Sequence, residues 1–383
     1  MTVFTCGPSI YQRAHIGNFR TFLFEDVLVR YLEYGGYRVT RGMNFTDVED
    51  KALKEASVRK VPVNVLTQGN IKEFLKESRL LRMKIPDYRP TASGSVNHAV
   101  AIIEELADRG IAYRYKGNVY FDPLQYPRFG ELYGLDMSSW PKKKIRFHRD
   151  TYPGMRWNRG DFILWHGCGN EDTLCWETRI GKGRPAWNVQ DPSMIIQFMD
   201  EPLSVYCGGI DNLVRHHDYT RAILESIRPY PMARYWLHCH HLFVNGQKMS
   251  KSKGNVYYVE TLLEEGYGRS EIRFFLIYGH YRKKMDYSHR QMNSCVEKLR
   301  LLKKTVAAIR KVAAKATKTE YKASDQIKRI FASHMDNDLD VKTAFDAVDD
   351  YVRKIEISQL QPGDAAGILQ ALGEIDEVLQ VIR

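Results

Sequence analysis

The first 41 residues alternate between strand-like and helix-like segments, and this alternation constrains the fold more than any other feature of the chain. Residues 3–5 form a short β-branched and aromatic run that ends in the turn residues Cys6-Gly7-Pro8. Apolar residues then recur at helical spacing between His15 and Tyr34. Gly35-Gly36 ends this pattern, and residues 37–41 alternate as the next strand. This order predicts a parallel, doubly wound α/β sheet.

The sequence pattern of the remaining chain changes in two places. Between residues 111 and 185 glycine, proline and tryptophan become frequent and helical periodicity disappears, which is typical of an insertion. From about residue 288 the chain is predicted to be helical, with a break at Pro362-Gly363. We therefore predict a Rossmann-type, doubly wound parallel sheet with an inserted domain, followed by a C-terminal helical bundle. The predicted ranges are 1–110 and 186–250 for the two halves of the sheet domain, 111–185 for the insertion, 251–300 for a linking segment that follows a lysine loop, and 301–383 for the bundle.

Composition narrows the class of protein. No stretch approaches the ~20 apolar residues that span a bilayer, and the N-terminus lacks the pattern of a secretory signal. We therefore expect a cytoplasmic protein with no membrane partner. Six cysteines in 383 residues do not suggest a disulfide framework. The net charge of +11 and the pI near 9.2 favour a polyanionic partner.

The segment His15-Ile16-Gly17-Asn18 lies where a turn opens the first predicted helix. Free N–H groups and the positive end of the helix dipole favour a phosphate at this position, and Gly17 permits close approach of a nucleotide. A histidine here can hydrogen-bond phosphate oxygens as they gain charge. We therefore predict that His15 is catalytic and that Gly17 and Asn18 contact a nucleotide. An ordinary helix start with a capping histidine is the alternative.

A lysine-rich segment, Lys248-Met249-Ser250-Lys251-Ser252, continues into Lys253-Gly254-Asn255. Such a segment predicts a mobile cationic loop, which can close on a triphosphate and neutralise the leaving pyrophosphate. We predict that Lys248 and Lys251 are catalytic, and that both lysines and Ser250 bind the triphosphate. A solvated basic turn is the alternative for this segment alone.

Two glycines follow the predicted strand at residues 203–207. Glycines at the carboxyl end of a strand mark the crevice in which doubly wound sheets bind nucleotides. Gly208 and Gly209 are therefore predicted to contact a nucleotide, and Asp211 can accept hydrogen bonds from its ribose hydroxyls.

Together these segments resemble the cysteinyl-tRNA synthetases, which are class I aminoacyl-tRNA synthetases. Residues 248–252 match the class I signature Lys-Met-Ser-Lys-Ser, and His15-Ile16-Gly17 precedes it. Other family segments have counterparts in the same order, at Thr5–Tyr11, Asn44–Lys51, Val119–Asp122, Gly160–Trp165 and Gly279–Arg282. The resemblance implies ATP-dependent activation of an amino acid, with Mg²⁺ on the phosphates. It also implies an amino-acid pocket formed by Gly7, Thr46, Trp187, Tyr206 and Cys207.

The family grips its substrate thiolate with a zinc ion, and the sequence departs from the family at this site. The resemblance places the four ligand positions on Cys6, Asp191, His216 and Thr220. The family has cysteine at the position of Asp191 and glutamate at that of Thr220. A carboxylate is a competent, harder zinc ligand, whereas threonine is a poor one. We therefore predict one zinc ion per chain on Cys6, Asp191 and His216, with the fourth position open for substrate.

Several substitutions leave alternatives open. Tyr206 replaces a family histidine and Cys207 a pocket glycine, so loss of zinc and selection of another amino acid is the competing interpretation. Asn18 replaces the second signature histidine, and we expect weakened activation. The run His-Cys-His-His at 238–241 could share a second metal only in part, because strand residues alternate in direction. Cys168 and Cys175 are expected to be solvent-facing thiols.

The acceptor of the acyl group has three candidate identities. Basic residues between Lys298 and Lys318 gather on one predicted helix and fit the phosphates of a tRNA stem, so we predict transfer to tRNA. The chain ends within or just after the bundle, where family enzymes continue into an anticodon-binding domain. A small amine, as in the mycothiol-ligase type, is therefore the alternative acceptor, and a non-catalytic tRNA-binding paralogue is the second alternative. We expect a monomer.

Overall fold

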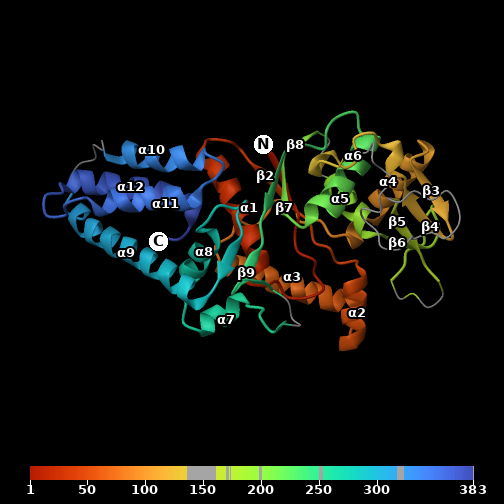
Figure 1. The fold of residues 1–383 in the computed structure, drawn as a ribbon, viewed down its shortest axis with the longest axis horizontal. Helices are drawn as coiled ribbons and strands as arrows, with labels where there is room; N and C mark the ends of the chain where they lie inside the picture. Colours follow the sequence, from red (N-terminus) through yellow and green to blue (C-terminus); the bar gives the residue numbers. More distant parts are fainter. Residues whose placement is uncertain are drawn as a thin grey trace. The chain divides into compact units, whose positions relative to one another are not determined.

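The computed structural model describes residues 1–135, 161–169, 172, 174–197, 201–249, 253–316 and 323–382 (Figure 1). The chain forms two compact units. Unit 1 consists of Met1–Arg13, Thr40–Lys72 and Pro86–Leu237. Unit 2 consists of Ala14–Val39, Glu73–Ile85 and His238–Arg383.

The centre of unit 1 is a parallel sheet in the order β2-β1-β7-β8. Strand β1 (Thr2–Thr5) pairs in parallel with both β2 (Thr40–Met43) and β7 (Leu203–Gly209). Val3 and Phe4 of β1 are fully buried, as expected for a central parallel strand covered on both faces. The fourth strand, β8, spans Ala233–Cys239. The parallel, doubly wound sheet predicted from the sequence is confirmed.

Helices α4 (Val96–Asp108), α5 (Trp187–Ile195) and α6 (Asp218–Ile227) pack against one another in unit 1. A second, antiparallel sheet has the order β3-β4-β5-β6. Its strands are Ala112–Tyr115, Asn118–Phe121, Phe162–Gly167 and Gly183–Pro185, and all lie in the range predicted to be an insertion. Phe162 stacks on Phe121 and on Tyr219 of α6, with ring centroids 4.7 and 4.0 Å apart. Helices α2 (Asp50–Arg59) and α3 (Val63–Leu80) lie between β2 and α4 in the sequence.

Unit 2 is built on α1 (Ile16–Tyr34), which packs against α8 (Arg269–Ile277), α12 (Pro362–Leu379) and β9 (Leu242–Val244). Strand β9 is the centre of a small sheet in the order β10-β9-β11, with β10 at Gln247–Lys248 and β11 at Met285–Tyr287. Helix α7 covers Val259–Glu264. The first signature segment and the lysine loop therefore belong to the same unit.

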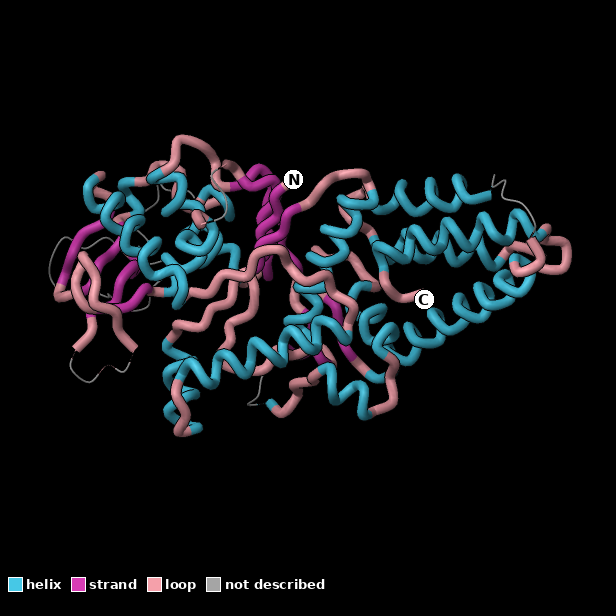
Figure 2. The backbone as a smooth tube through the Cα atoms, turned by 180° about the vertical axis from the view of Figure 1, so that it is seen from behind, coloured by secondary structure: helices cyan, strands magenta, loops and turns pink. Residues whose placement is uncertain are grey.

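The C-terminal helices of unit 2 lie side by side in both views (Figures 1 and 2). They are α9 (His289–Ala313), α10 (Ala323–Met335), α11 (Val341–Arg353) and the α12 already named. Pro362 is the first residue of α12, a position where its missing N–H costs nothing, and this explains the predicted break. The predicted C-terminal helical bundle is confirmed.

Two sequence-based expectations differ from the fold. The apolar run at 274–278 has the length of a strand, but Phe274–Ile277 belong to helix α8. Helix α1 lies in the range predicted as the first half of the sheet domain, yet it groups with the C-terminal helices in unit 2. Among the described residues no helix is both long and apolar enough to cross a membrane.

Candidate functional site

His15 is the N-cap of α1, and its contacts fix how the ring is presented. Its Nδ1 accepts a hydrogen bond from the backbone N–H of Asn18 at 3.2 Å. In return, the Asn18 side-chain oxygen accepts from the backbone N–H of His15 at 3.0 Å. This reciprocal capping box satisfies two free helix donors. The capping alternative considered for His15 is therefore present in the structure, and it leaves Nε2 as the ring atom that can face a ligand.

Burial lowers the pKa of His15 to about 4, and the nearby Lys248 ammonium acts in the same direction. The imidazole is therefore neutral at physiological pH. Because Nδ1 accepts a hydrogen bond, the proton of the neutral ring lies on Nε2. His15 can thus donate one hydrogen bond without adding a charge.

The two signature segments contact each other within unit 2. A Cβ on Gly17 would lie 2.7 Å from Cε of Met249, so a side chain at position 17 would require the end of the Met249 side chain to move. The backbone N–H of Ile16 donates to the carbonyl of Tyr257 at 2.9 Å, which ties the start of α1 to the chain beyond the loop. Lys248 is exposed on β10. The predicted site residues Ser250 and Lys251 lie outside the described residues.

The glycines after β7 lie in unit 1 and have close neighbours. A Cβ on Gly209 would lie 2.7 Å from Oδ1 of Asp211, so the carboxylate folds back over the strand end. Asp211 itself is exposed. The ATP contacts predicted for Gly208, Gly209 and Asp211 stay predictions.

Cys6, His216 and His217 form a buried cluster in unit 1. One candidate ligand atom from each of the three side chains lies within 4.8 Å of the other two. Cys6 follows β1, and both histidines belong to a π-helical segment, η5 (Leu213–His217), that leads into α6. A thiolate and two imidazoles suit zinc. The predicted ligand set shares Cys6 and His216 with this cluster and does not include His217.

Asp191 lies outside this cluster, contrary to the predicted ligand set. Its Oδ2 is 3.0 Å from Nε2 of His216 and accepts a hydrogen bond from the Tyr206 hydroxyl at 2.7 Å. Its Oδ1 accepts from the Asn44 amide at 2.8 Å. Thr220, the predicted poor ligand, donates its hydroxyl proton to the His216 carbonyl at 2.9 Å. The carboxylate of Asp191 is therefore occupied by its neighbours.

Tyr206 and Cys207 were both predicted to line the amino-acid pocket, but they are consecutive on β7. Side chains alternate along a strand, so these two point to opposite faces. The hydroxyl of Tyr206 reaches Asp191, and Cys207 belongs to no metal-competent cluster among the described residues. Cys207 is therefore turned away from the side that Tyr206 faces, and it does not replace the lost thiolate.

The other predicted pocket residues lie near the cluster or beside the Cys6 turn. Trp187 stacks on the His216 ring with centroids 4.1 Å apart. The backbone N–H of Gly7 donates to the Asn44 side chain at 2.8 Å, and a Cβ at Gly7 would lie 1.9 Å from the Asn44 carbonyl oxygen. Thr46 is buried, and its carbonyl accepts from the N–H of Ile10 at 3.1 Å.

Other candidate metal residues have different surroundings. Cys168 and Cys175 form a disulfide, which corrects the expectation of solvent-facing thiols. Their neighbour Asp172 would complete a three-residue cluster only if the disulfide were reduced. None of residues 238–241 belongs to a metal-competent cluster in the described parts of the chain. Burial raises the pKa of Cys239 to about 11, so its thiol stays protonated.

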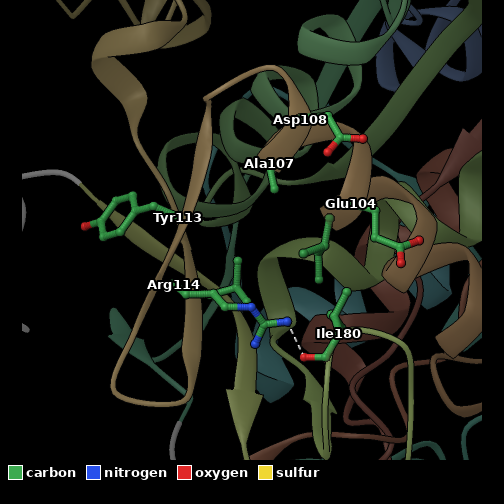
Figure 3. Close-up of a pocket in the computed structure, with 8 residues that line it drawn as sticks. Glu104, Ala107, Asp108, Tyr113, Arg114 and Ile180 are labelled. Carbon is green, nitrogen blue, oxygen red and sulfur yellow. Dashed lines mark hydrogen bonds between the residues drawn. The ribbon is translucent and has the colours of Figure 1, made fainter.

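A hollow of about 340 Å³ lies elsewhere in unit 1, between α4 and the antiparallel sheet (Figure 3). Glu104, Asp108 and Arg114 are among its lining residues. Arg114 donates to the Ile180 carbonyl at its edge. No residue predicted to bind ATP, amino acid or metal lines this hollow, and we assign it no role.

Three partly buried histidines are expected to make the protein sensitive to acid. Burial lowers the pKa of His15, His166 and His238 to about 4 in each case. Between pH 6.5 and 4 the unfolded chain binds protons at these positions and the folded chain does not, so stability falls as pH falls. We expect unfolding near pH 5 to take up about three protons from this source.

Urea unfolding between pH 7.5 and 5 measures this uptake. His238→Gln should lower the uptake by about one proton relative to wild type. An unfolding free energy that stays constant or rises toward pH 5 would contradict the expectation.

Comparisons with known sequences agree with this geometry. Residues 1–297 match the family model described as the class I (C) tRNA synthetase catalytic domain. A cysteine–tRNA ligase of Chlamydia pneumoniae is 35% identical over 390 residues, which cover 99% of this chain and 82% of the relative. One of Brachyspira hyodysenteriae is 36% identical over 293 residues, or 75% of this chain and 60% of the relative.

A comparison with solved structures supports the same fold. A Mycobacterium tuberculosis methionyl-tRNA synthetase in complex with methionyl-adenylate has a TM-score of 0.71 at 14% identity, covering 99% of this chain and 91% of the other. At this identity the likeness concerns the fold alone. The sequence matches carry the assignment further: the chain belongs to the cysteine–tRNA ligase family of the class I aminoacyl-tRNA synthetases, which are ligases.

Proposed function

We propose that this chain activates cysteine with ATP and transfers the cysteinyl group to a tRNA. The observation that carries the proposal is the contact between the two signature segments. Gly17 lies against Met249, and the backbone N–H of Ile16 donates to the Tyr257 carbonyl, so the capped start of α1 lies beside the described residues on both sides of the lysine loop. Such an arrangement serves to hold a triphosphate between helix N–H groups and lysine ammonium groups.

In the first step the cysteine carboxylate attacks the α-phosphate of ATP, and the bond to pyrophosphate breaks. The protein contributes positioning and charge stabilisation to this step. Neutral His15 donates a hydrogen bond from Nε2 to a phosphate oxygen, and Lys248 and Lys251 neutralise the departing pyrophosphate. Mg²⁺ on the phosphates would reduce their charge further. Gly17 and Asn18 place the helix start against the nucleotide.

The residues of unit 1 serve recognition in this proposal. Asp211 accepts hydrogen bonds from ribose hydroxyls, and Gly208 and Gly209 leave room beside the nucleotide. Gly7, Thr46 and Trp187 border the amino acid. Cys6 and His216 would hold the zinc ion that the family implies, and zinc there supplies a bond to a substrate thiol that serine or alanine cannot make.

Exchange of labelled pyrophosphate into ATP, measured with each of the twenty amino acids, tests activation. We expect exchange with cysteine alone, because zinc would bind the substrate thiol and serine or alanine cannot make that bond. Packing without a metal would separate cysteine from serine or alanine by only ~1–3 kcal/mol. Exchange driven by a non-thiol amino acid would show that the pocket selects another substrate. No exchange with any amino acid would contradict the enzyme proposal and favour a non-catalytic tRNA-binding protein.

The tRNA proposal concerns a smaller set of basic residues than the sequence suggested. Three of the basic side chains on α9 already have partners in unit 2: Lys298 contacts Asp346 at 2.8 Å, Arg300 contacts Glu271 at 2.7 Å and Lys303 contacts Ser270 at 2.9 Å. Lys318 lies outside the described residues. The exposed residues of the helix and its C-terminal end that remain for phosphates are Lys304, Arg310, Lys311 and Lys315.

We expect Arg310→Glu/Lys311→Glu to weaken tRNA binding and to lower the slope of log affinity against log salt by about two, one per lost phosphate contact. A matched control is Arg329→Glu/Lys354→Glu, which reverses one exposed arginine and one exposed lysine elsewhere in the bundle. Binding measured between 50 and 200 mM salt distinguishes them. Equal slopes in both variants would show that α9 does not contact the tRNA phosphates. Activation of cysteine without tRNA binding at low salt would favour a small-amine acceptor.

A further inference from the structure

The buried cluster of Cys6, His216 and His217 differs from the ligand set that family resemblance gives. Its three side chains are each at most 8% exposed. The Asn212 side-chain amide donates a hydrogen bond to Sγ of Cys6 at 3.5 Å. The cluster therefore offers one sulfur and two nitrogen donors at one place, a set that zinc and cobalt(II) bind in tetrahedral geometry.

The backbone of β7 makes room for this cluster. A Cβ on Gly208 would lie 2.5 Å from Cε1 of His217 and 3.2 Å from Cβ of Cys6. The ring of Tyr206, on the same face of β7, meets the His217 ring edge-on with centroids 4.7 Å apart. Gly208 and Tyr206 thus determine where the His217 ring lies beside Cys6.

Asp191 contacts the same cluster through Nε2 of His216. It is fully buried, and Tyr206, Asn44 and His216 surround both of its oxygens. Nε2 of His216 faces this carboxylate, while Nδ1 of His216 is buried with no hydrogen-bond partner among the described residues. A buried imidazole nitrogen without a partner is costly, and a metal ion would satisfy it.

We propose that His217 is the third protein ligand of the zinc ion, together with Cys6 and Nδ1 of His216, and that Asp191 is a positioning residue. Asp191 accepts the Nε2 proton of His216 in a hydrogen bond, which fixes the tautomer and directs Nδ1 toward the ion. His217 thereby replaces, as a zinc ligand, the cysteine thiolate that the family has at position 191. The inference deepens the proposed function by naming the ligands of its metal, and it is tested without substrate.

Metal content and cobalt(II) spectra of purified protein decide between the two ligand sets. Wild-type protein should bind one equivalent of zinc, and its cobalt(II) form should show tetrahedral visible bands and a sulfur charge-transfer band. Cys6→Ser should lose the charge-transfer band, and His217→Gln should lose bound zinc. The control His98→Gln, at an exposed position on α4, should match wild type.

Asp191→Asn separates a ligand from a positioning residue. We expect this variant to keep one equivalent of zinc and the tetrahedral cobalt spectrum, with affinity in a chelator competition lowered 10–100-fold. If Asp191→Asn fails to fold, Tyr206→Phe provides the same test, because it removes one hydrogen bond from the carboxylate and no ligand. Wild-type affinity in His217→Gln, or a wild type that binds no zinc, would overturn the proposal. Failure of cysteine-dependent exchange in a zinc-replete protein would instead overturn the proposed function.

Discussion

Replacing His15 with asparagine is expected to lower pyrophosphate exchange by about 10²–10³-fold, the usual loss for one preorganised donor to transition-state charge. The capping box makes this substitution informative. Asparagine is among the preferred N-cap residues, so its side chain can accept the N–H of Asn18 as Nδ1 of His15 does. The helix start is kept, and the donor at Nε2 is lost.

Three comparisons complete this experiment. The melting temperature of His15→Asn should stay close to that of wild type, whereas His15→Ala should lose both exchange and the ~0.5–2 kcal/mol of an N-cap. Lys251→Ala should lose exchange by roughly 10²-fold or more, because it removes a charge partner of the pyrophosphate. Full exchange activity in His15→Asn would show that His15 only caps the helix.

Removing Asp26 is expected to destabilise the protein by about 3–5 kcal/mol, because it leaves the buried charge of Arg273 without its counterion. Both side chains are fully buried in unit 2, and Nη2 of Arg273 lies 2.7 Å from Oδ2 of Asp26. Arg273 also donates to the carbonyls of Leu81 and Leu379 at 2.9 and 2.7 Å. One guanidinium thus joins α8 to α1 and to the ends of α3 and α12.

Urea unfolding of Asp26→Ala measures this effect. The matched control is Arg59→Met, which breaks the exposed pair of Arg59 and Glu55 on α2 and should cost less than ~1 kcal/mol. A loss in Asp26→Ala as small as that of the control would mean that water reaches Arg273 and compensates its charge.

The amino-acid sequence allowed predictions for those parts of the fold and the site that are encoded in short contiguous segments. The strand–turn–helix order of residues 1–41 predicted the parallel sheet, which is confirmed. The two signature segments, each a short contiguous motif, predicted a phosphate site, and that site stays a prediction. The strand expected at residues 274–278 is part of a helix instead, because a short apolar segment has the same composition in a buried helix and in a strand. The fully buried Arg273 within α8 has no sequence signal of its own.

The metal cluster shows a different limit of sequence reasoning. Asp191 stands where the family has a ligand, so alignment of motifs assigned it that role, yet its carboxylate is occupied by Tyr206, Asn44 and His216. His217 was not predicted as a ligand, because consecutive residues on a regular α-helix point about 100° apart and are not expected to reach the same ion. The π-helical geometry of η5 was not visible in the sequence. The consecutive histidines were the one signal that could have identified the pair.

The division of the chain between the two units has a consequence for biosynthesis. The chain passes from one unit to the other after residues 13, 39, 72, 85 and 237, so neither unit is a continuous segment. Once residue 237 has emerged from the ribosome, all of unit 1 is outside. At that point α1 still lacks α8 and α12, the helices that pack against it. At usual elongation rates the rest takes roughly 7–30 s to emerge, and during this time the nascent chain exposes α1 to chaperones and aggregation.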